Sequence, residues 1–261
     1  MGKLFLNVLW ILVLTITTQI GGVVYLIAKI IYRKSILKKW IAFVVLYLLS
    51  TYAIVPYVAP LFGREKIKTT DTIKIHTLFT SLANRNYVIP EVNNVLANVS
   101  EKFLKTYPNV EIHCLDSNFP FFDGFPLPPH LSHKDGKKLD ISLLYEDAKG
   151  TILNDKPSVS GYGIFAGPST AEYDQISVCK EKDYWQYDFS KYLTFGTIHS
   201  DLNFSKKGTK NIIQLLTEEP TISKIFIEPH LRDRMNVRHP KIRYHGCHAV
   251  RHDDHIHLQV R

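Results

Sequence analysis

The chain has 261 residues, of which 45% are hydrophobic, and its 32 lysines and arginines against 24 aspartates and glutamates give a net charge of +8. The basic residues form no aromatic-interleaved stripe of the kind that binds nucleic acid, so the charge does not predict a nucleic-acid partner. A positively charged domain suits an anionic polymer such as a cell wall, although most of the charge is expected on an ordinary solvated surface.

The first 63 residues differ in composition from the rest of the chain. Two runs there, residues 4–28 and 40–63, contain no charged residue. A helix needs about 20 apolar residues to cross a bilayer. We therefore predict a two-helix transmembrane hairpin over residues 1–63, with spans at about residues 4–31 and 40–62. A cleaved secretory signal is the alternative for the first run, but that run is too long and no small-residue cleavage pattern follows it.

The connection between the two predicted spans is basic. It carries Arg33, Lys34, Lys38 and Lys39. Basic residues tend to stay on the cytoplasmic side of a membrane, so we expect this connection inside and both chain ends outside. The chain would then be held in the inner (cytoplasmic) membrane, with everything after about Arg64 on the periplasmic or extracytoplasmic side.

The region outside the membrane is predicted as a helical connecting region, residues 64–105, followed by one domain, residues 106–261. It is long enough to bury a substantial hydrophobic core. Three cysteines permit at most one intramolecular disulfide, and the sequence does not rank the possible pairings. They are Cys114, Cys179 and Cys247.

Apolar periodicity predicts the elements of this region in chain order. Residues 69–106 are expected to be mainly helical, because Val92, Leu96, Val99, Phe103 and Leu104 recur at helical spacing. Strands are predicted at residues 110–114, 139–145, 223–228, 242–247 and 255–260, and helices at residues 211–217 and 231–237. Residues 149–171 form a long loop of a kind that often serves a site. The predicted fold is α+β, with a central antiparallel sheet and peripheral helices.

Histidines concentrate near the C-terminus, where seven of the 12 lie between residues 230 and 257. On the last predicted strand, His255 and His257 share one face because side chains alternate across a strand. About 120 residues upstream, His133 precedes Asp140 by seven positions. Together these residues have the ligand chemistry of a three-residue zinc site with one position left open, as a hydrolase requires.

These motifs resemble the LAS metallopeptidases, which include lysostaphin-type and D-alanyl-D-alanine peptidases. The longer patterns, His130-x-x-His133 and His252-Asp-x-His255-x-His257, are most similar to those of penicillin-insensitive murein endopeptidases. The resemblance covers about residues 130–261. It implies an extracytoplasmic LAS-like domain that requires Zn²⁺.

The resemblance also implies separate roles for the histidines. The zinc ligands would be His133, Asp140 and His257. His255 and His252 would line the open face, where they position water and stabilise the oxyanion. His130 would be either an auxiliary ligand or a residue beside the ligands. When bound, zinc lowers the pKa of water to about 7 and polarises a carbonyl oxygen.

Three further residues leave alternatives open. The family often has an acidic residue two positions before the zinc aspartate, and here that position is Lys138, which either alters the surroundings of the ligands or points to solvent. Asp253 and Asp254 either orient imidazoles through their ring N–H groups or are solvated turn residues.

The implied function is that of a membrane-anchored, zinc-dependent murein endopeptidase. It would hydrolyse amide bonds in peptidoglycan peptide crosslinks of the D-alanyl to diaminopimelyl type. One alternative is a D,D- or L,D-carboxypeptidase with the same ligands, and another is a non-catalytic, zinc-stabilised module that binds the cell wall. The expected partners are peptidoglycan peptides and the membrane, with no nucleic acid.

Overall fold

The structure is a computed structural model that describes residues 2–261. The chain forms two compact units, each of which is built from several segments. The first comprises Met1–Ile67, Leu78–Pro90 and Ser117–Lys137, and the second comprises Lys68–Thr77, Glu91–Asp116 and Lys138–Arg261. Helices and mixed sheets together make the fold α+β, as predicted.

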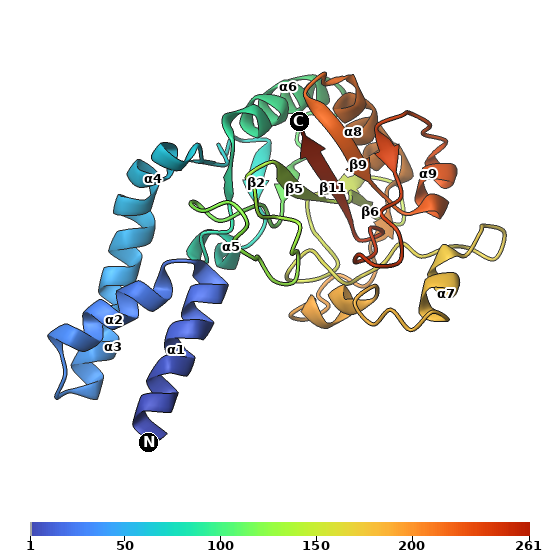
Figure 1. Cartoon of the computed structure of the whole chain (residues 1–261). Helices are drawn as coiled ribbons and strands as arrows, with labels where there is room; N and C mark the ends of the chain where they lie inside the picture. Colours follow the sequence, from blue (N-terminus) through green and yellow to red (C-terminus); the bar gives the residue numbers. More distant parts are fainter. Residues whose placement is uncertain (1) are drawn as a thin grey trace. The chain divides into compact units, whose positions relative to one another are not determined.

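The first unit begins with apolar helices (Figure 1). In chain order they are α1 (Gly2–Thr18), α2 (Gly21–Ile31), α3 (Ile36–Leu49), a π turn (Ser50–Ile54), α4 (Val55–Val58) and a 3₁₀ turn (Ala59–Phe62). From α3 onward these elements join into one continuous helix, Ile36–Phe62. Pro56 and Pro60 lie in its second half and lack the N–H that a regular α-helix donates, so the turns change type there.

The first predicted span is not a single helix. Gln19 adopts a φ of 66° and separates α1 from α2. The two helices then fold back on each other, and the Tyr25 hydroxyl donates to Oδ1 of Asn7 at 2.9 Å. Gly22 permits this close approach, because a Cβ there would lie only 2.0 Å from Oγ1 of Thr15. At 11 residues, α2 is about 16 Å long, which is short of the roughly 30 Å of a hydrocarbon core.

The predicted two-helix transmembrane hairpin is therefore not supported. Within residues 2–261, only Ile36–Phe62 is long and apolar enough to cross a membrane, judged by length and composition. We expected the N-terminus outside the membrane because the first span was predicted as one continuous helix. That expectation loses its basis. Hydropathy alone could not find the break, because residues 4–28 are apolar on both sides of it.

The rest of the first unit is a small sheet and a long loop. β1 (Glu65–Lys66) pairs antiparallel with β3 (Tyr87–Val88), and α5 (Leu78–Leu82) lies between them in the chain. Residues 117–137 then run without regular structure apart from a bridge to β3. Their aromatic side chains anchor the loop, because the rings of Phe121 and Phe62 lie 5.0 Å apart.

The second unit contains a six-stranded sheet. Its strands are, in spatial order, β10 (Ile242–Arg243), β9 (Ile222–Phe226), β11 (His255–Val260), β5 (Lys138–Ser142), β4 (Ile112–Cys114) and β2 (Ile73–Ile75). The inner pairs are antiparallel, but β10 runs parallel to β9 and β2 runs parallel to β4. The sheet is thus mixed, and the predicted antiparallel arrangement holds only for its centre, where β11 lies between β5 and β9 (Figure 1).

Helices α6 (Pro90–Thr106), α8 (Lys206–Glu218) and α9 (Pro229–Met235) belong mainly to this unit. The helix expected over residues 69–106 begins only at Pro90, because β2 and α5 come first. Four residues of its predicted apolar face are buried, whereas Leu104 is 43% exposed. Lys102 of α6 contacts Glu218 of α8 at 3.1 Å, so the two helices lie side by side.

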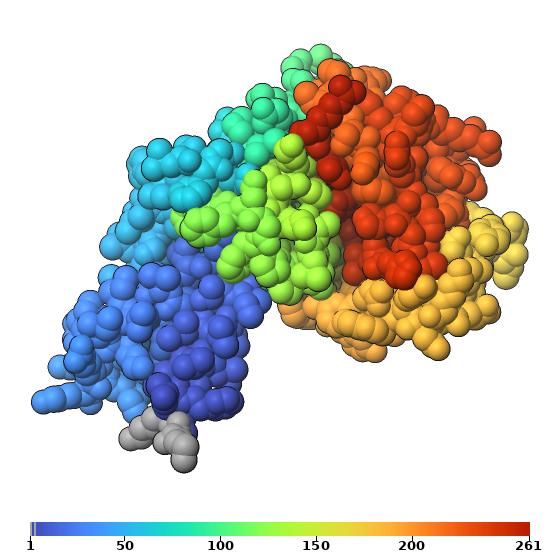
Figure 2. All heavy atoms as spheres, in the orientation of Figure 1, coloured from blue at the N-terminus to red at the C-terminus, as the bar shows by residue number. Residues whose placement is uncertain are grey.

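A segment between the sheet strands carries short elements. They are β6 (Tyr145–Glu146), β7 (Ile152–Leu153), α7 (Gln175–Lys180), a 3₁₀ turn (Phe189–Leu193) and β8 (Asn203–Phe204), with β6, β7 and β8 forming a separate sheet. A disulfide joins Cys179 to Cys247, whereas Cys114 is a buried thiol. In Figure 2 the yellow residues of this segment adjoin the red C-terminal residues, and Arg251 donates its N–H to the carbonyl of Tyr187 at 2.9 Å.

We expect the disulfide to stabilise this region strongly. Replacing Cys179 and Cys247 by alanine should lower the free energy of unfolding by about 2–5 kcal/mol, because the bond closes a loop with a sequence separation of 68. Thermal unfolding of the full chain in detergent measures the effect. Reductant should lower the melting temperature of the wild type and leave that of the double variant unchanged; a wild type insensitive to reductant would contradict the expectation.

Candidate metal centre

The pairing of β5 with β11 brings the predicted ligands together. The register places His257 opposite Asp140 and Gln259 opposite Lys138. Directly opposed residues on paired strands project on the same face, and His255 joins that face because it lies two positions from His257. Asp140 and His255 are fully buried, and His257 is 3% exposed.

Asp140 is the centre of this group. Its Oδ1 atom lies 2.8 Å from Nδ1 of His257 and 3.8 Å from Nε2 of His255. The Tyr162 hydroxyl donates to Oδ2 at 2.8 Å and accepts the N–H of Asp116 at 3.0 Å. One carboxylate oxygen thus faces the imidazoles, while the other is held by a buried phenol.

Tyr162 lies in the loop that we predicted to serve a site, but its role was not foreseen. Removing its hydroxyl as Tyr162→Phe should reduce metal affinity by about 10-fold, because partners that orient a ligand contribute 10–100-fold. Competition with a chromogenic chelator measures that affinity. Tyr192→Phe, at an exposed tyrosine, is the matched control. Equal affinities in the two variants would show that the phenol does not support a metal ligand.

Asp254 orients His255. The Nδ1–H group of His255 donates to Oδ1 of Asp254 at 2.5 Å, and Oδ2 accepts the N–H of Gly163 at 2.6 Å. Burial alone would lower the pKa of His255, but the carboxylates of Asp140 and Asp254 outweigh burial and raise it to about 9. Of the two roles left open by the sequence, Asp254 therefore takes the orienting one.

Asp253 is also buried rather than solvated. Arg251 donates to both of its oxygens, from Nε at 2.7 Å and from Nη2 at 2.6 Å. The same guanidinium reaches Asp188 through Nη1 at 2.9 Å and lies over the Phe165 ring at 3.8 Å. This ion pair fixes the turn before β11, so Asp253 supports the strand end and not an imidazole of the cluster.

His252 is buried beside the other C-terminal histidines. Its ring centroid lies 4.9 Å from that of His255 and 5.6 Å from that of His257. Burial and these neighbouring imidazoles lower the pKa of His252 well below its usual value. The backbone N–H of His252 donates to the buried carboxyl of Glu228 at 3.0 Å. His245, which sequence reasoning did not single out, is exposed, and its ring lies 5.6 Å from that of His252.

The upstream histidines, His130 and His133, come from the loop of the first unit. Their ring centroids are 5.4 Å apart, and His133 donates its backbone N–H to the carbonyl of His130. Nδ1 of His133 donates to the carbonyl of Ser117 at 2.6 Å, which fixes the orientation of the ring. Gly136 adopts a φ of 76°, a conformation that glycine tolerates in the tight turn between His133 and the aspartate.

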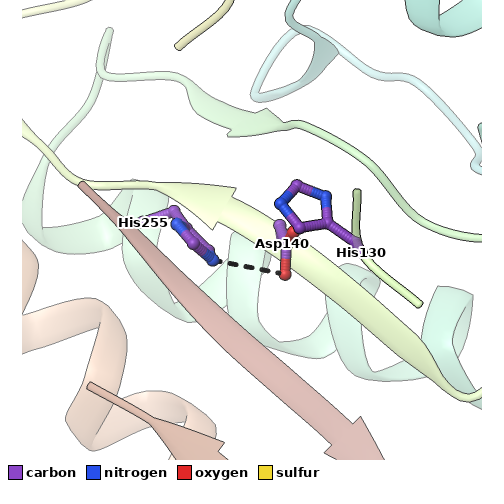
Figure 3. A group of neighbouring side chains, drawn as sticks. All are labelled: His130, Asp140 and His255. Carbon is purple, nitrogen blue, oxygen red and sulfur yellow. Dashed lines mark ion pairs between the residues drawn. The ribbon is translucent and has the colours of Figure 1, made fainter. Parts of the chain in front are cut away.

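Within residues 2–261, two groups of three buried residues could hold a metal ion. One is His133, Asp140 and His257, and the other is His130, Asp140 and His255. Within each group the ligand atoms lie within 4.8 Å of one another. Figure 3 shows the second group, in which both imidazoles are directed toward the carboxylate of Asp140. Imidazole and carboxylate donors of this kind suit zinc and other divalent transition metals.

Lys138 is buried in β5, two positions before Asp140. Residues two apart on a strand share a face, so Lys138 lies on the face of the candidate metal centre. It does not point to solvent. Of the two alternatives left by the sequence, a positive charge near the ligands is the one that remains.

Comparison with known proteins does not assign the chain to a family. No family model matches it, and no curated protein is similar to it at a significant level. The residues of the candidate metal centre therefore carry the functional proposal.

Proposed function

We propose that the chain is a membrane-anchored, zinc-dependent murein endopeptidase that hydrolyses peptidoglycan peptide crosslinks of the D-alanyl to diaminopimelyl type. One observation carries the proposal. Asp140, which is common to both histidine groups, lies beside the imidazoles of His252 and His255, whose pKa values are shifted in opposite directions. A metal site with a purely structural role would not need two imidazoles with oppositely shifted pKa values.

His133, Asp140 and His257 are the residues that would hold the zinc. The ligand atoms of these three residues lie within 4.8 Å of one another, and imidazole and carboxylate donors suit zinc, so the residues fit the ion. His130 would be either an auxiliary ligand or a residue beside the ligands. When bound, zinc activates water and polarises the carbonyl oxygen of the substrate.

The two proton transfers of the proposed hydrolysis are divided between His252 and His255. Groups with pKa values pushed apart by their surroundings take the acid and base roles. His252, which burial keeps neutral, accepts a proton from the attacking water. His255, which Asp140 and Asp254 keep protonated, donates a hydrogen bond to the developing oxyanion and a proton to the leaving amine.

The proposed location is the outer side of the cytoplasmic membrane. The helix Ile36–Phe62 would anchor the chain. Arg33, Lys34 and Lys38 lie near its N-terminal end and favour the cytoplasm for that end. The Cys179–Cys247 disulfide supports an oxidising compartment for the second unit. Peptidoglycan peptides are the amide substrate expected there.

Purified full chain in detergent, incubated with crosslinked muropeptides, tests the proposal. We expect crosslinked dimers to be converted to monomers, a chelator to stop the reaction and added zinc to restore it. Release of a terminal amino acid without loss of dimers would assign the carboxypeptidase alternative. Zinc-dependent retention on peptidoglycan without any cleavage would assign the binding module, and either outcome would reject the endopeptidase.

A further inference from the structure

The first unit contains an apolar groove of about 390 Å³. This volume lies within the roughly 300–1,000 Å³ of ordinary ligand pockets. One wall is a face of α2 and the residue before it, and the other is the second half of the helix Ile36–Phe62. The central wall residues are Ile20, Val23 and Ile27 on the first side and Ile54, Val55 and Val58 on the second.

The groove is long and narrow, as its wall residues indicate. Ile20, Val23 and Ile27 recur at helical spacing along one face of α2, and the first and last are seven residues apart. At 1.5 Å per residue, they line about 10 Å of groove. Val23 and Ile54 are 61% and 50% exposed, so the groove is open along its side. An extended apolar chain fits this shape better than a compact ring system does.

One end of the groove is polar. Gln19 lines it and is only 6% exposed. Its Oε1 accepts the N–H of Phe121 at 3.0 Å, but its Nε2 has no hydrogen-bond partner among the described residues. A buried amide donor without an acceptor is destabilising, so a ligand that brings an acceptor to this end is favoured.

Aromatic residues gather at the same end. Phe62 contacts Phe121 and Phe122 with ring centroids 5.0 and 5.4 Å apart, and all three line the groove. Phe62 is the last residue of the candidate membrane span. In the proposed membrane placement this end of the helix reaches the membrane interface, which is the depth at which the ester carbonyls of a phospholipid lie. The aliphatic walls lead from there toward the hydrocarbon core.

We propose that this groove binds one acyl chain of a membrane glycerophospholipid, with an ester carbonyl accepting a hydrogen bond from Nε2 of Gln19. The inference rests on the membrane placement proposed above but not on hydrolysis. The bound chain lies between α2 and the helix Ile36–Phe62 and fills the space that their side chains leave. It thereby holds α2 against the membrane-spanning helix.

Photolabelling tests the site. The full chain is placed in vesicles of phosphatidylethanolamine and phosphatidylglycerol that contain a phosphatidylcholine with a diazirine on one acyl chain. We expect adducts to concentrate on the groove walls. Val58→Trp fills the groove and should reduce labelling there by more than about fivefold. Val44→Trp, at an exposed position of the same helix outside the groove, is the matched control and should label as the wild type does.

A second variant tests the polar end. Gln19→Glu keeps an oxygen for the N–H of Phe121 but replaces the donor by a second acceptor, so groove labelling should fall by about fivefold, as expected for one lost hydrogen bond. Adducts spread evenly over all exposed apolar faces, and unchanged by Val58→Trp, would overturn the proposal. So would crosslinks between two chains through the groove. Hydrolysis of muropeptides by the same preparations in detergent should be unaffected by Val58→Trp, which separates this inference from the proposed activity.

Discussion

Replacing Asp140 by asparagine should abolish metal binding and peptidase activity together. Asp140 is the residue common to both histidine groups, and its Oδ1 lies 2.8 Å from Nδ1 of His257. Asparagine keeps the shape of the side chain but loses the negative charge that balances a divalent cation. Partners that only orient a ligand contribute 10–100-fold to affinity or activity, so loss of a ligand should lower activity by more than about 100-fold.

The experiment separates a metal role for Asp140 from a structural one. Zinc that binds only the folded state stabilises it by about 4 kcal/mol at 1,000 times its dissociation constant. We expect this zinc-dependent rise in melting temperature in the wild type and in Asp201→Asn, an exposed control. In Asp140→Asn the rise should vanish, whereas the zinc-free melting temperature should stay the same or increase, because a buried charge has been removed.

Two results would contradict this interpretation of Asp140. One is a variant that keeps the zinc-dependent rise. The other is a zinc-free variant that unfolds at a much lower temperature while the wild type shows no response to zinc. The second result would assign Asp140 to a hydrogen-bond network with Tyr162 and His257, with no metal.

The sequence was most informative where local pattern and chemistry coincide. The alternation around His255 and His257 predicted a strand with both imidazoles on one face, and β11 has that form. The spacing of Val92, Leu96, Val99 and Phe103 likewise predicted the buried face of α6. In both cases the period of the pattern equals the period of the element, so no tertiary information was needed.

The sequence was least informative where a partner distant in the chain decides the outcome. The role of Asp254 stayed open between orienting an imidazole and lying solvated in a turn. Its carboxylate accepts from Gly163 and from the ring of His255, and no sequence pattern reveals the contact with Gly163. Tyr162 reaches Asp140 from a loop without periodicity. The pairing of Cys179 with Cys247 depends on the folded path of 68 residues.

The N-terminal helices show the opposite failure, in which a local signal was present but was outweighed. Gly21 and Gly22 follow Gln19 after one residue, Ile20, and mark a helix break, since glycine tolerates close helix approach and weakens a helix interior. Mean hydropathy over about 20 residues averages such a break away. Residues 4–28 therefore looked like one span although they contain two helices.

Replacing His255 by alanine should leave zinc bound and remove turnover. His255 is fully buried, is oriented by Asp254, and directs Nε2 toward Asp140 at 3.8 Å. In the proposed reaction it supplies the proton for the leaving amine, and such a group contributes about 10²–10⁴-fold. Zinc content by mass spectrometry and single-turnover cleavage of muropeptide dimers measure the two effects on the same sample.

The matched variant is His257→Ala, because both residues lie on the same face of β11 and each belongs to one of the two groups that could hold a metal. If the metal lies with His133, Asp140 and His257, then His257→Ala loses zinc while His255→Ala keeps it. If the metal lies with His130, Asp140 and His255, the two variants exchange behaviour, and the roles proposed for the two strand histidines are reversed. Zinc retained by both variants would mean that neither imidazole is an essential ligand, and it would reject the proposed centre altogether. His255 and His257 lie two positions apart on the same face of one strand. Comparing the two alanine variants therefore tests which histidine is the ligand without altering the fold that presents them.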